Sequence, residues 1–247
     1  MNEILFFDIK INPLSKSEFL DIIESNLKKG NQIIQNGLNA ASINELVNNE
    51  KLKQAYKNSD LINIDGMSIV WVLRFMGFSI PERVACPDLA NDILAMAEKN
   101  KFSVFLFGTK ERNLLLCKEN LRKNYPNLNI AGSRNGYYRE EEESAIIDMI
   151  NRTNADILLL GMPSPNKELF MEKYKDKLTS KYIFGVGGLF DILSGLKKRA
   201  PLWIQRIGME WFYRFAQEPF RLWRRYLIGN IKFLILVNKE KSNIQKL

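Results

Sequence analysis

Residues 156–168 read DILLLGMPSPNKE, which is an unbroken apolar run, then a glycine, then a Ser-Pro pair. A continuous apolar run of this length is typical of a strand that is buried on both faces of a parallel sheet. Ser164 followed by Pro165 predicts the start of a helix, with the serine as N-cap and the proline in the first position. The stretch therefore predicts a buried strand that ends near Gly161 and leads directly into a helix.

The same order of a short strand and a longer helix recurs along the chain. The predicted strands are EILFFDI (3–9), QIIQ (32–35), LINI (61–64), SVFLF (103–107), LNIAG (128–132), DILLL (156–160) and YIFGV (182–186). The predicted helices cover residues 15–29, 40–57, 67–76, 88–100, 110–124, 140–153 and 165–179. Strands that alternate with helices form βαβ units, in which the strands run parallel. We predict an α/β fold with a mostly parallel sheet covered by helices on both faces.

The positive charge lies at the C-terminal end of the chain. The 247 residues have a net charge of +8, but residues 197–247 hold 12 Lys/Arg and 3 Asp/Glu, which leaves 24 basic and 25 acidic residues in 1–196. The composition changes at GLKKRAP (195–201). We therefore divide the chain into an α/β body at 1–196 and a basic helical appendage at 197–247. An excess of basic side chains in one segment indicates an anionic partner there.

Several features favour a protein that is made and kept in the cytoplasm. Cys86 and Cys117 have no paired spacing, which fits a reducing compartment better than a disulfide framework. The start, MNEILFFDIKINP, lacks the basic and long apolar regions of a signal peptide. The longest apolar run of the tail, FLILV, is far shorter than the ~18 residues that a membrane span needs.

The chain contains no histidine. This excludes mechanisms that need an imidazole base or ligand, so the simplest proton acceptor near neutral pH is a carboxylate. There is also no D-x-D pair and no cluster of metal-ligating residues. We expect neither a metal nor another cofactor.

Five predicted strands end in loops that contain glycine: NGLNAAS (36–42), DGMS (65–68), GTKERN (108–113), GMPSPNKE (161–168) and GVGGLFD (185–191). The carboxyl ends of parallel strands lie at one edge of the sheet, where ligands bind. Glycine allows the backbone to approach a ligand, and a following helix N-terminus favours phosphate. Thr109 is expected to cap the helix after Gly108. Each loop alone is consistent with an ordinary turn, but the five together favour a nucleotide-like ligand.

Two aspartates stand out at these strand ends. Asp65 follows LINI and precedes Gly66 and a helix, so it is either a catalytic carboxylate or a helix cap. Asp191 lies just inside a predicted helix start. It either binds a ribose or base, or it interacts favourably with the helix dipole.

The tail stretch EPFRLWRRYLIGNIKFLILV (218–237) combines arginines with aromatic residues. Pro219 fits the first turn of a helix on which Arg221, Arg225 and Lys232 share one face. An apolar arc next to a basic stripe suits a helix that lies in a membrane interface. Three alternatives stay open: packing on the body, binding of single-stranded nucleic acid through phosphate contacts and stacking, and a role as a membrane adaptor without catalysis.

The chain also resembles a known family through NIDGMSIVW, PERVACPDL, FLFGTKERN, GMPSPNKE, GVGGLFDILSGLKKRAP and WFYRFAQEPFRLWRRYLIGN. These motifs, within residues 35–237, are similar to the WecG/TagA/CpsF bacterial glycosyltransferases, or glycosyltransferase family 26. The resemblance implies a Rossmann-like body with a C-terminal helical appendage, peripheral on the inner face of the cell membrane. It implies inverting transfer from a UDP-sugar to a polyprenyl-diphosphate-linked sugar in teichoic acid or other surface polysaccharide synthesis. N-acetylmannosamine is the leading donor sugar and N-acetylglucosamine the acceptor; another UDP-hexose, used for capsule or exopolysaccharide, is the alternative.

The resemblance also assigns roles to particular residues. Asp65 falls on the catalytic aspartate as general base, Asn39 on an asparagine near the sugar, and Asp191 on a nucleoside contact. The diphosphates of donor or acceptor are assigned to Arg214, Arg221 and Arg224. Further substrate contacts are expected from Gly37, Arg83, Gly108, Thr109, Gly161, Lys167 and Gly187. We expect no nucleic-acid partner and leave the oligomeric state open.

Three positions depart from the family's common pattern. Gly37 stands where threonine is common, Lys167 where glutamine is common, and Cys86 where glycine is common. The first two positions are expected to line the sugar pocket. The reaction class is therefore better determined than the sugar, and an ammonium at Lys167 suggests a hexose or an acidic sugar as alternative donors.

Overall fold

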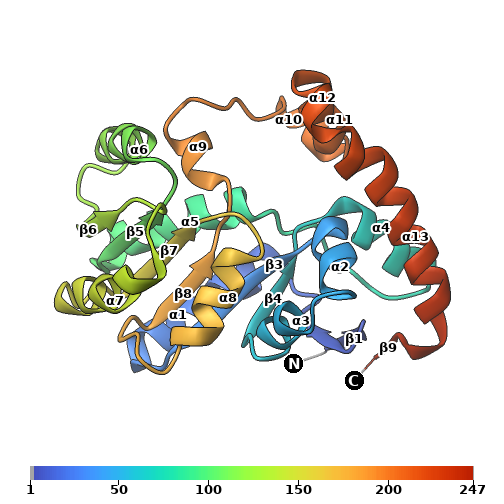
Figure 1. Ribbon diagram of the computed structural model, residues 1–247, viewed down its shortest axis with the longest axis horizontal. Helices are drawn as coiled ribbons and strands as arrows, with labels where there is room; N and C mark the ends of the chain where they lie inside the picture. Colours follow the sequence, from blue (N-terminus) through green and yellow to red (C-terminus); the bar gives the residue numbers. More distant parts are fainter. Residues whose placement is uncertain (1–2, 247) are drawn as a thin grey trace.

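The computed structural model describes residues 3–246 and contains a parallel sheet of six strands (Figure 1). The strands lie in the order β4-β3-β8-β7-β5-β6, and every neighbouring pair is parallel. Their bounds are β3 Ile33–Leu38, β4 Leu61–Ile64, β5 Val104–Gly108, β6 Ile130–Arg134, β7 Ile157–Gly161 and β8 Tyr182–Gly185. All residues of β3, β4, β5, β7 and β8 are buried, as the apolar runs predict. The predicted α/β fold is confirmed.

Helices cover both faces of this sheet. Those of the body are α1 Lys16–Lys29, α2 Ala40–Leu46, α3 Glu50–Lys57, α4 Met67–Phe75, α5 Cys86–Asn100, α6 Glu111–Asn124, α7 Glu143–Arg152 (after a 3-10 turn, η1 Glu140–Glu142), α8 Asn166–Tyr174 and α9 Leu189–Leu193. The side chains of α1, α5, α6 and α9 form one apolar cluster with the sheet, and those of α7 and α8 form another. A third cluster joins α2, α3 and α4 to the N-terminal strands and to the C-terminal helix.

The N-terminal segment differs from the prediction of one strand at 3–9. It forms an antiparallel hairpin of β1 (Ile4–Phe6) and β2 (Ile9–Ile11), outside the main sheet. Phe7 and Asp8 both have positive φ, 55° and 60°, as in the two-residue turns whose twist matches a hairpin. The apolar run therefore folds back on itself. Ile9 and Ile11 are buried in the third cluster, and Lys10 between them is exposed.

Two predictions about helix boundaries are wrong. The predicted helix at 40–57 is divided into α2 and α3, because Asn49 caps a new helix by accepting from the Leu52 N–H. Ser164 does not cap α8, which begins one residue later than predicted with Pro165 in the N-cap position. The Ser164 hydroxyl donates instead to Glu45, 3.4 Å away.

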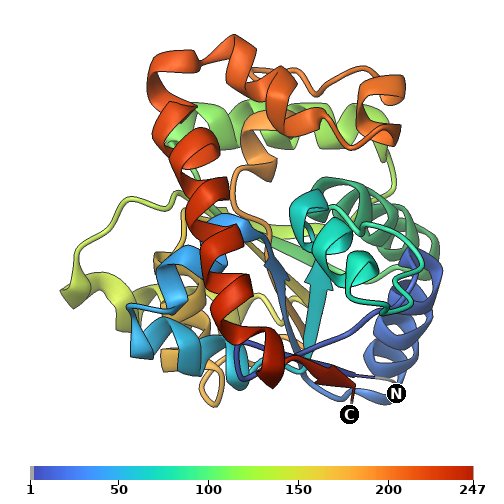
Figure 2. The same cartoon turned by 90° about the vertical axis from the view of Figure 1, so that its right-hand side faces the viewer.

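The tail crosses the molecule and returns to the N-terminus (Figures 1 and 2). It comprises α10 Leu202–Arg206, α11 Glu210–Gln217, α12 Pro219–Trp223, a π-helical turn η2 Arg224–Ile228, α13 Gly229–Glu240, a 3-10 turn η3 Lys241–Asn243 and β9 Gln245–Lys246. The helix that starts at Pro219 continues through Gly229. Its α13 part packs on α2, where Asn44 Nδ2 donates to the Gly229 carbonyl at 2.7 Å, and β9 pairs with β1. Within residues 3–246, none of the helices combines the length and hydrophobicity that a membrane-spanning helix needs.

Candidate functional site

A cavity of 1220 Å³ lies at the carboxyl edge of the sheet, between the body and the tail. Its walls include residues from the loops that follow β3, β4, β5, β7 and β8, which are the five glycine-containing loops of the sequence. The opposite wall comes from α11, α12 and α13. The volume exceeds the ~300–1000 Å³ of ordinary small-molecule pockets, so a ligand the size of a nucleotide sugar fits.

Basic side chains dominate the lining of the cavity. It contains Arg83, Lys110, Arg112, Lys167, Lys197, Lys198, Arg199, Arg214, Arg221 and Arg225. The acidic residues are Glu45, Asp65, Asp191, Glu210 and Glu218. A concave site of this charge attracts anions such as a diphosphate.

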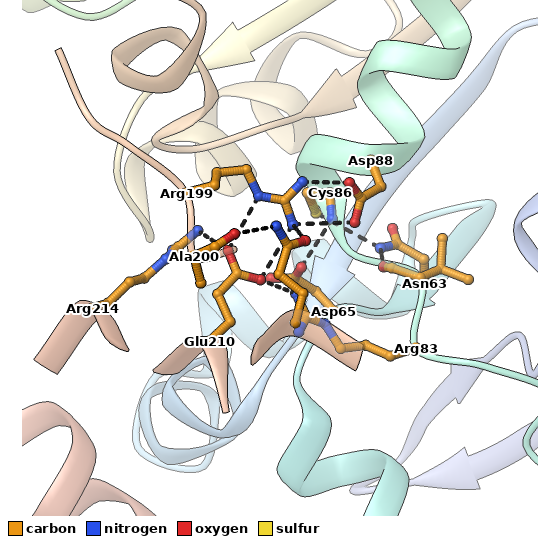
Figure 3. Close-up of polar contacts among 11 residues, drawn as sticks. Asn63, Asp65, Arg83, Cys86, Asp88, Arg199, Ala200, Glu210 and Arg214 are labelled. Carbon is orange, nitrogen blue, oxygen red and sulfur yellow. Dashed lines mark hydrogen bonds and ion pairs between the residues drawn. The ribbon is translucent and has the colours of Figure 1, made fainter. Parts of the chain in front are cut away.

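Asp65 lies at the end of β4 and lines the cavity (Figure 3). One carboxylate oxygen, Oδ1, accepts the backbone N–H of Cys86 at 2.9 Å. This bond fixes the carboxylate against the first turn of α5 and leaves Oδ2 for another partner. Asp65 does not cap its own helix, α4, whose N-cap is Gly66. The prediction that Asp65 caps the helix that follows it is therefore wrong, and the remaining oxygen is compatible with the catalytic interpretation.

A buried ion-pair network joins the tail to the body beside Asp65 (Figure 3). At its centre is Glu210 of α11, whose side chain is 4% exposed and is paired with Arg83 (2.7 Å), Arg199 (3.3 Å) and Arg214 (3.0 Å). Burial alone would raise the pKa of Glu210, but the three guanidinium groups lower it to about 2. Arg199 also pairs with Asp88 of α5. The network contains three arginines and two carboxylates, so it has a net positive charge. All three arginines line the cavity.

Arg83 connects this network with Asp65. Burial disfavours its charge, but the negative charges of Asp65 and Glu210 raise the pKa of Arg83 above its usual range. Its Nε is buried and has no hydrogen-bond partner among the described residues. One donor of this permanently charged side chain is therefore unsatisfied in the described part of the chain, and Arg83 lines the cavity.

The tail arginines do not all lie where the resemblance predicts. Arg214 and Arg221 line the cavity, but Arg224 does not, and Arg225 lines it instead. The guanidinium of Arg224 lies over the Trp223 ring, with 5.2 Å to its centroid. The π-helical turn at Arg224–Ile228 adds one residue to the local helical repeat, so simple helical spacing does not determine which arginine faces inward.

At the far end of the cavity, Asp191 accepts hydrogen bonds from Thr109 Oγ1 (3.2 Å) and Asn113 Nδ2 (3.1 Å). Lys197 is 3.4 Å from its other oxygen. The prediction that Thr109 caps α6 is wrong, because Lys110 is the N-cap and the Thr109 hydroxyl is turned to Asp191. Asp191 lies in the first turn of α9, as predicted. Asp191, Thr109 and Asn113 together form a polar end of the cavity that suits the hydroxyls or base of a nucleoside.

Lys167 lines the cavity, and its charge is balanced by an ion pair. Its Nζ pairs with Glu168, whose side chain is fully buried, and Glu168 also accepts from the Tyr56 hydroxyl at 3.2 Å. Glu168 Oε2 has no hydrogen-bond partner among residues 3–246. Burial, followed by the charge of Glu168, raises the pKa of Tyr56 well above its usual value, so this hydroxyl stays protonated.

The remaining predicted site residues are placed as follows. Asn39, Gly37, Gly161 and Gly187 line the cavity, whereas Gly108 does not. Asn39 caps α2 by accepting from the N–H groups of Ala41 and Ser42. Gly108 lies against the backbone of Gly161, and a Cβ at either position would overlap its neighbours. The Gly108 position thus serves close packing of the strand ends.

Sequence reasoning missed Glu210, Arg199 and Asn113, and it treated Cys86 only as a departure from the family pattern. Glu210 precedes Arg214 by four residues, a spacing at which helical ion pairs form, so this signal was available. Its pairing with Arg83 joins residues that are 127 positions apart, and no local pattern predicts that.

Within the part of the chain that the structure describes, no three His, Cys, Asp or Glu side chains gather as a metal site would require.

Comparison with known proteins places this geometry in context. The family model described as "Glycosyl transferase WecG/TagA/CpsF family" matches residues 4–246. Two similar relatives, from Bacillus subtilis (strain 168) and Bacillus spizizenii (strain ATCC 23059 / NRRL B-14472 / W23), are both named N-acetylglucosaminyldiphosphoundecaprenol N-acetyl-beta-D-mannosaminyltransferase. The first is 32% identical over 186 residues, 75% of this chain and 71% of the relative. The second is 32% identical over 183 residues, 74% of this chain and 70% of the relative.

Proposed function

Because this chain belongs to the WecG/TagA/CpsF family of glycosyltransferases, we propose that it transfers N-acetylmannosamine from a UDP-sugar to N-acetylglucosamine on a polyprenyl diphosphate. The observation that carries this proposal is the position of Asp65. Its carboxylate stands at a strand end in a cavity whose lining contains twice as many basic as acidic side chains. That arrangement offers a proton acceptor next to a site for a leaving diphosphate.

In the proposed reaction, Asp65 accepts the proton of the acceptor hydroxyl. The hydroxyl oxygen forms a bond to the anomeric carbon while the bond from that carbon to the UDP oxygen breaks, so the configuration inverts. UDP leaves with the bonding electron pair. Arg83, Arg214 and Arg221 are suited to stabilise the charge that develops on its phosphates, because they line the same cavity. Asp191, at the opposite end, is suited to hold the nucleoside.

The Lys167–Glu168 pair favours a neutral donor sugar. An unpaired ammonium would favour a sugar carboxylate, but this one is already bound to a buried carboxylate. Displacing Glu168 would leave its charge buried without a partner, which is costly. The acidic-sugar alternative is therefore disfavoured. N-acetylmannosamine and other neutral sugars of UDP-hexoses remain compatible with the Lys167–Glu168 pair.

We also propose that the tail attaches to an anionic membrane surface. The side of α12, η2 and α13 that does not line the cavity exposes Phe220, Trp223, Leu227, Ile228, Ile231 and Ile235. Leu222, Phe233 and Val237 point the other way and are buried, so this helix combines core packing with an exposed apolar side. Aliphatic and aromatic side chains next to Arg224 and Lys232 suit the headgroup region, and each basic residue near such a surface contributes about 1 kcal/mol.

A transfer assay tests the proposed function directly. The purified chain is incubated with a short-chain polyprenyl-diphosphate N-acetylglucosamine and a panel of UDP-sugars, and product and anomeric configuration are measured. We expect transfer from UDP-N-acetylmannosamine with inversion. Transfer only from another UDP-hexose would support the alternative donor. Tight, salt-sensitive binding of oligonucleotides without affinity for UDP would contradict the enzyme and support a nucleic-acid-binding protein.

A further inference from the structure

Two residues of the cavity lining next to Asp65, Gly37 and Cys86, compete for one space, which we call the floor of the cavity. Gly37 is in the buried strand β3, and Cys86 is the first residue of α5; both line the cavity. A Cβ built on Gly37 would overlap Sγ of Cys86. Its next neighbours, Asn63 Nδ2 and Asp65 Cβ, would be 3.4 Å away, which is tolerable contact. Within this lining, the Cys86 sulfur is therefore the atom that must shift before a side chain fits at position 37.

Backbone conformation does not explain the glycine. Gly37 is absent from the residues with positive φ, and its strand pairs regularly with β4 and β8. An alanine would adopt the same backbone without strain. The requirement for glycine is thus a requirement for room, and Cys86 creates it.

We propose that Gly37 and Cys86 are a specificity-determining pair for the donor sugar, in which the Cys86 thiol replaces a side chain at position 37 as the pocket floor. This inference rests on the proposed transfer reaction, in which Asp65 stands at the anomeric carbon. A group beside Asp65 is then close to the ring atoms bonded to the anomeric carbon, and one of these is carbon 2, where N-acetylmannosamine and N-acetylglucosamine differ.

The chemistry of the thiol determines what such a floor can distinguish. A thiol is a weak donor and a weak acceptor, and its best polar neighbour is Asn63 Nδ2 at 3.7 Å. Burial raises the pKa of Cys86, so the group stays neutral. The floor therefore distinguishes sugars by their shape at this position, and not by a hydrogen bond to a sugar hydroxyl. Selection by shape in a weakly polar pocket gives about 10–200-fold, whereas a hydrogen-bonding site reaches 10⁴–10⁵-fold.

A double-mutant cycle tests the steric part of the proposal. The variants are Gly37→Ala, Cys86→Ala and the double variant, with Cys117→Ala as control, because Cys117 is the other buried cysteine and lies in α6, away from the cavity. We expect Gly37→Ala alone to lose at least tenfold in kcat/KM and to melt several degrees lower. The double variant recovers both to near the Cys86→Ala values, because the added methyl then occupies the vacated space. Equal losses in Gly37→Ala and in the double variant would overturn the pair.

The ratio of kcat/KM for UDP-N-acetylmannosamine to that for UDP-N-acetylglucosamine tests the role in specificity. We expect this ratio to change at least fivefold in Cys86→Ala and to stay constant in Cys117→Ala. Gly37→Thr combined with Cys86→Gly places a hydroxyl on the same floor and is expected to change the ratio at least tenfold. A constant ratio in all these variants would overturn the role in specificity. If the unmodified chain uses neither donor, the proposed function fails, while the melting temperatures still decide whether the two residues form a steric pair.

Discussion

The body and the tail contribute to the same cavity, but they are held in place by different forces. The body presents Asp65, Asn39 and Asp191 at the ends of strands or the starts of helices, and five of the six strands of its parallel sheet are buried along their whole length. In the tail, α10 buries no residue, α11 buries only Glu210, and α12 buries only Leu222. The side chains of the body are thus fixed by the core, whereas α10–α12 bury little, and α11 is joined to the body by the ion pairs of Glu210.

This difference indicates which part of the site can open. Segments with few buried apolar contacts have low local stability, and mobile binding elements belong to this class. The tail is anchored by the Glu210 network at one end and by Phe233 and Val237 of α13 at the other. Between these anchors, α11 and α12 carry Arg214 and Arg221 on the cavity wall. We therefore expect that local opening of α10–α12, rather than of the body, admits substrate.

The largest effect is expected from the body. Asp65→Asn keeps the shape of the side chain but removes the proton acceptor, so turnover is expected to fall about 10²–10⁴-fold. UDP binding is expected to persist, because Asp65 meets the sugar end of the donor. The matched control is Asp148→Asn, an exposed aspartate of α7. Near-normal turnover of Asp65→Asn on the lipid-linked acceptor would remove this residue from its role.

The next largest effect tests whether the tail takes part in chemistry. Arg221→Lys keeps the charge but loses the planar fork that binds two phosphate oxygens. Transfer to a soluble short-chain acceptor is expected to fall about 10–100-fold, equivalent to the ~1.5–3 kcal/mol of a charge-assisted hydrogen bond. Arg224→Lys is expected to lose less, because Arg224 lies outside the cavity lining.

Liposome sedimentation separates this role from membrane attachment. Both arginine variants keep their charge, so both are expected to sediment with anionic vesicles as the unmodified chain does. A full transfer rate for Arg221→Lys with the soluble acceptor would mean that the tail only attaches the enzyme.

A substitution at Glu210 is expected to lower the local stability of the tail while the core of the body keeps its stability. Glu210→Gln leaves Arg83, Arg199 and Arg214 without their shared carboxylate, and breaking a buried pair costs about 3 kcal/mol. Hydrogen exchange in α10–α12 is expected to accelerate by about 10²-fold, while β5 and β7 stay protected. Glu24→Gln, which breaks the exposed pair with Lys28, is the control and should change little. Equal acceleration in tail and body would contradict the division into two regions.

The pH dependence of the tail follows from the same carboxylate. The pKa of Glu210 is about 2 in the folded chain against 4.5 for the unperturbed group. A depressed pKa contributes stability that is complete above the unfolded value and is lost as the pH falls toward the folded one. The protection of α10–α12 against exchange, measured relative to the intrinsic exchange rate at each pH, is therefore expected to fall between pH 4.5 and 2 in the unmodified chain. In Glu210→Gln this acid-dependent part should disappear.

The two regions also differ in how far their sequence predicts their structure. The buried strands of the body were predicted within about three residues at each end, because a continuous apolar run has one common explanation in an α/β fold. The loops at the ends of these strands were placed at one edge of the sheet because the strands were predicted to run parallel. The hairpin at 4–11 was missed because Phe7 and Asp8 turn without a glycine.

The tail was harder to predict because its contacts are distant in sequence. Periodicity predicted a helix from Pro219 onward, but not the π-helical turn that brings Arg225 rather than Arg224 to the cavity. The partners of Glu210 include Arg83, and those of Arg199 include Asp88. Such pairs depend on how two regions pack. The space shared by Gly37 and Cys86 became evident only from the coordinates, although both residues already stood out in the sequence.

The smallest expected effect concerns metal ions, and it bears on how the two regions divide the work. Inverting transfer needs positive charge at the leaving diphosphate, and Mg²⁺, Mn²⁺ or arginines can each supply it. In this cavity the body supplies Arg83 and the tail supplies Arg214 and Arg221. We therefore expect transfer to continue at an unchanged rate after dialysis against EDTA. Activity that is abolished by EDTA and restored by Mn²⁺ would contradict this prediction. The sharper comparison uses Arg221→Lys: if charge at the diphosphate comes from the tail, added Mn²⁺ should not restore its rate, whereas recovery would mean that a metal ion on the body can replace the tail.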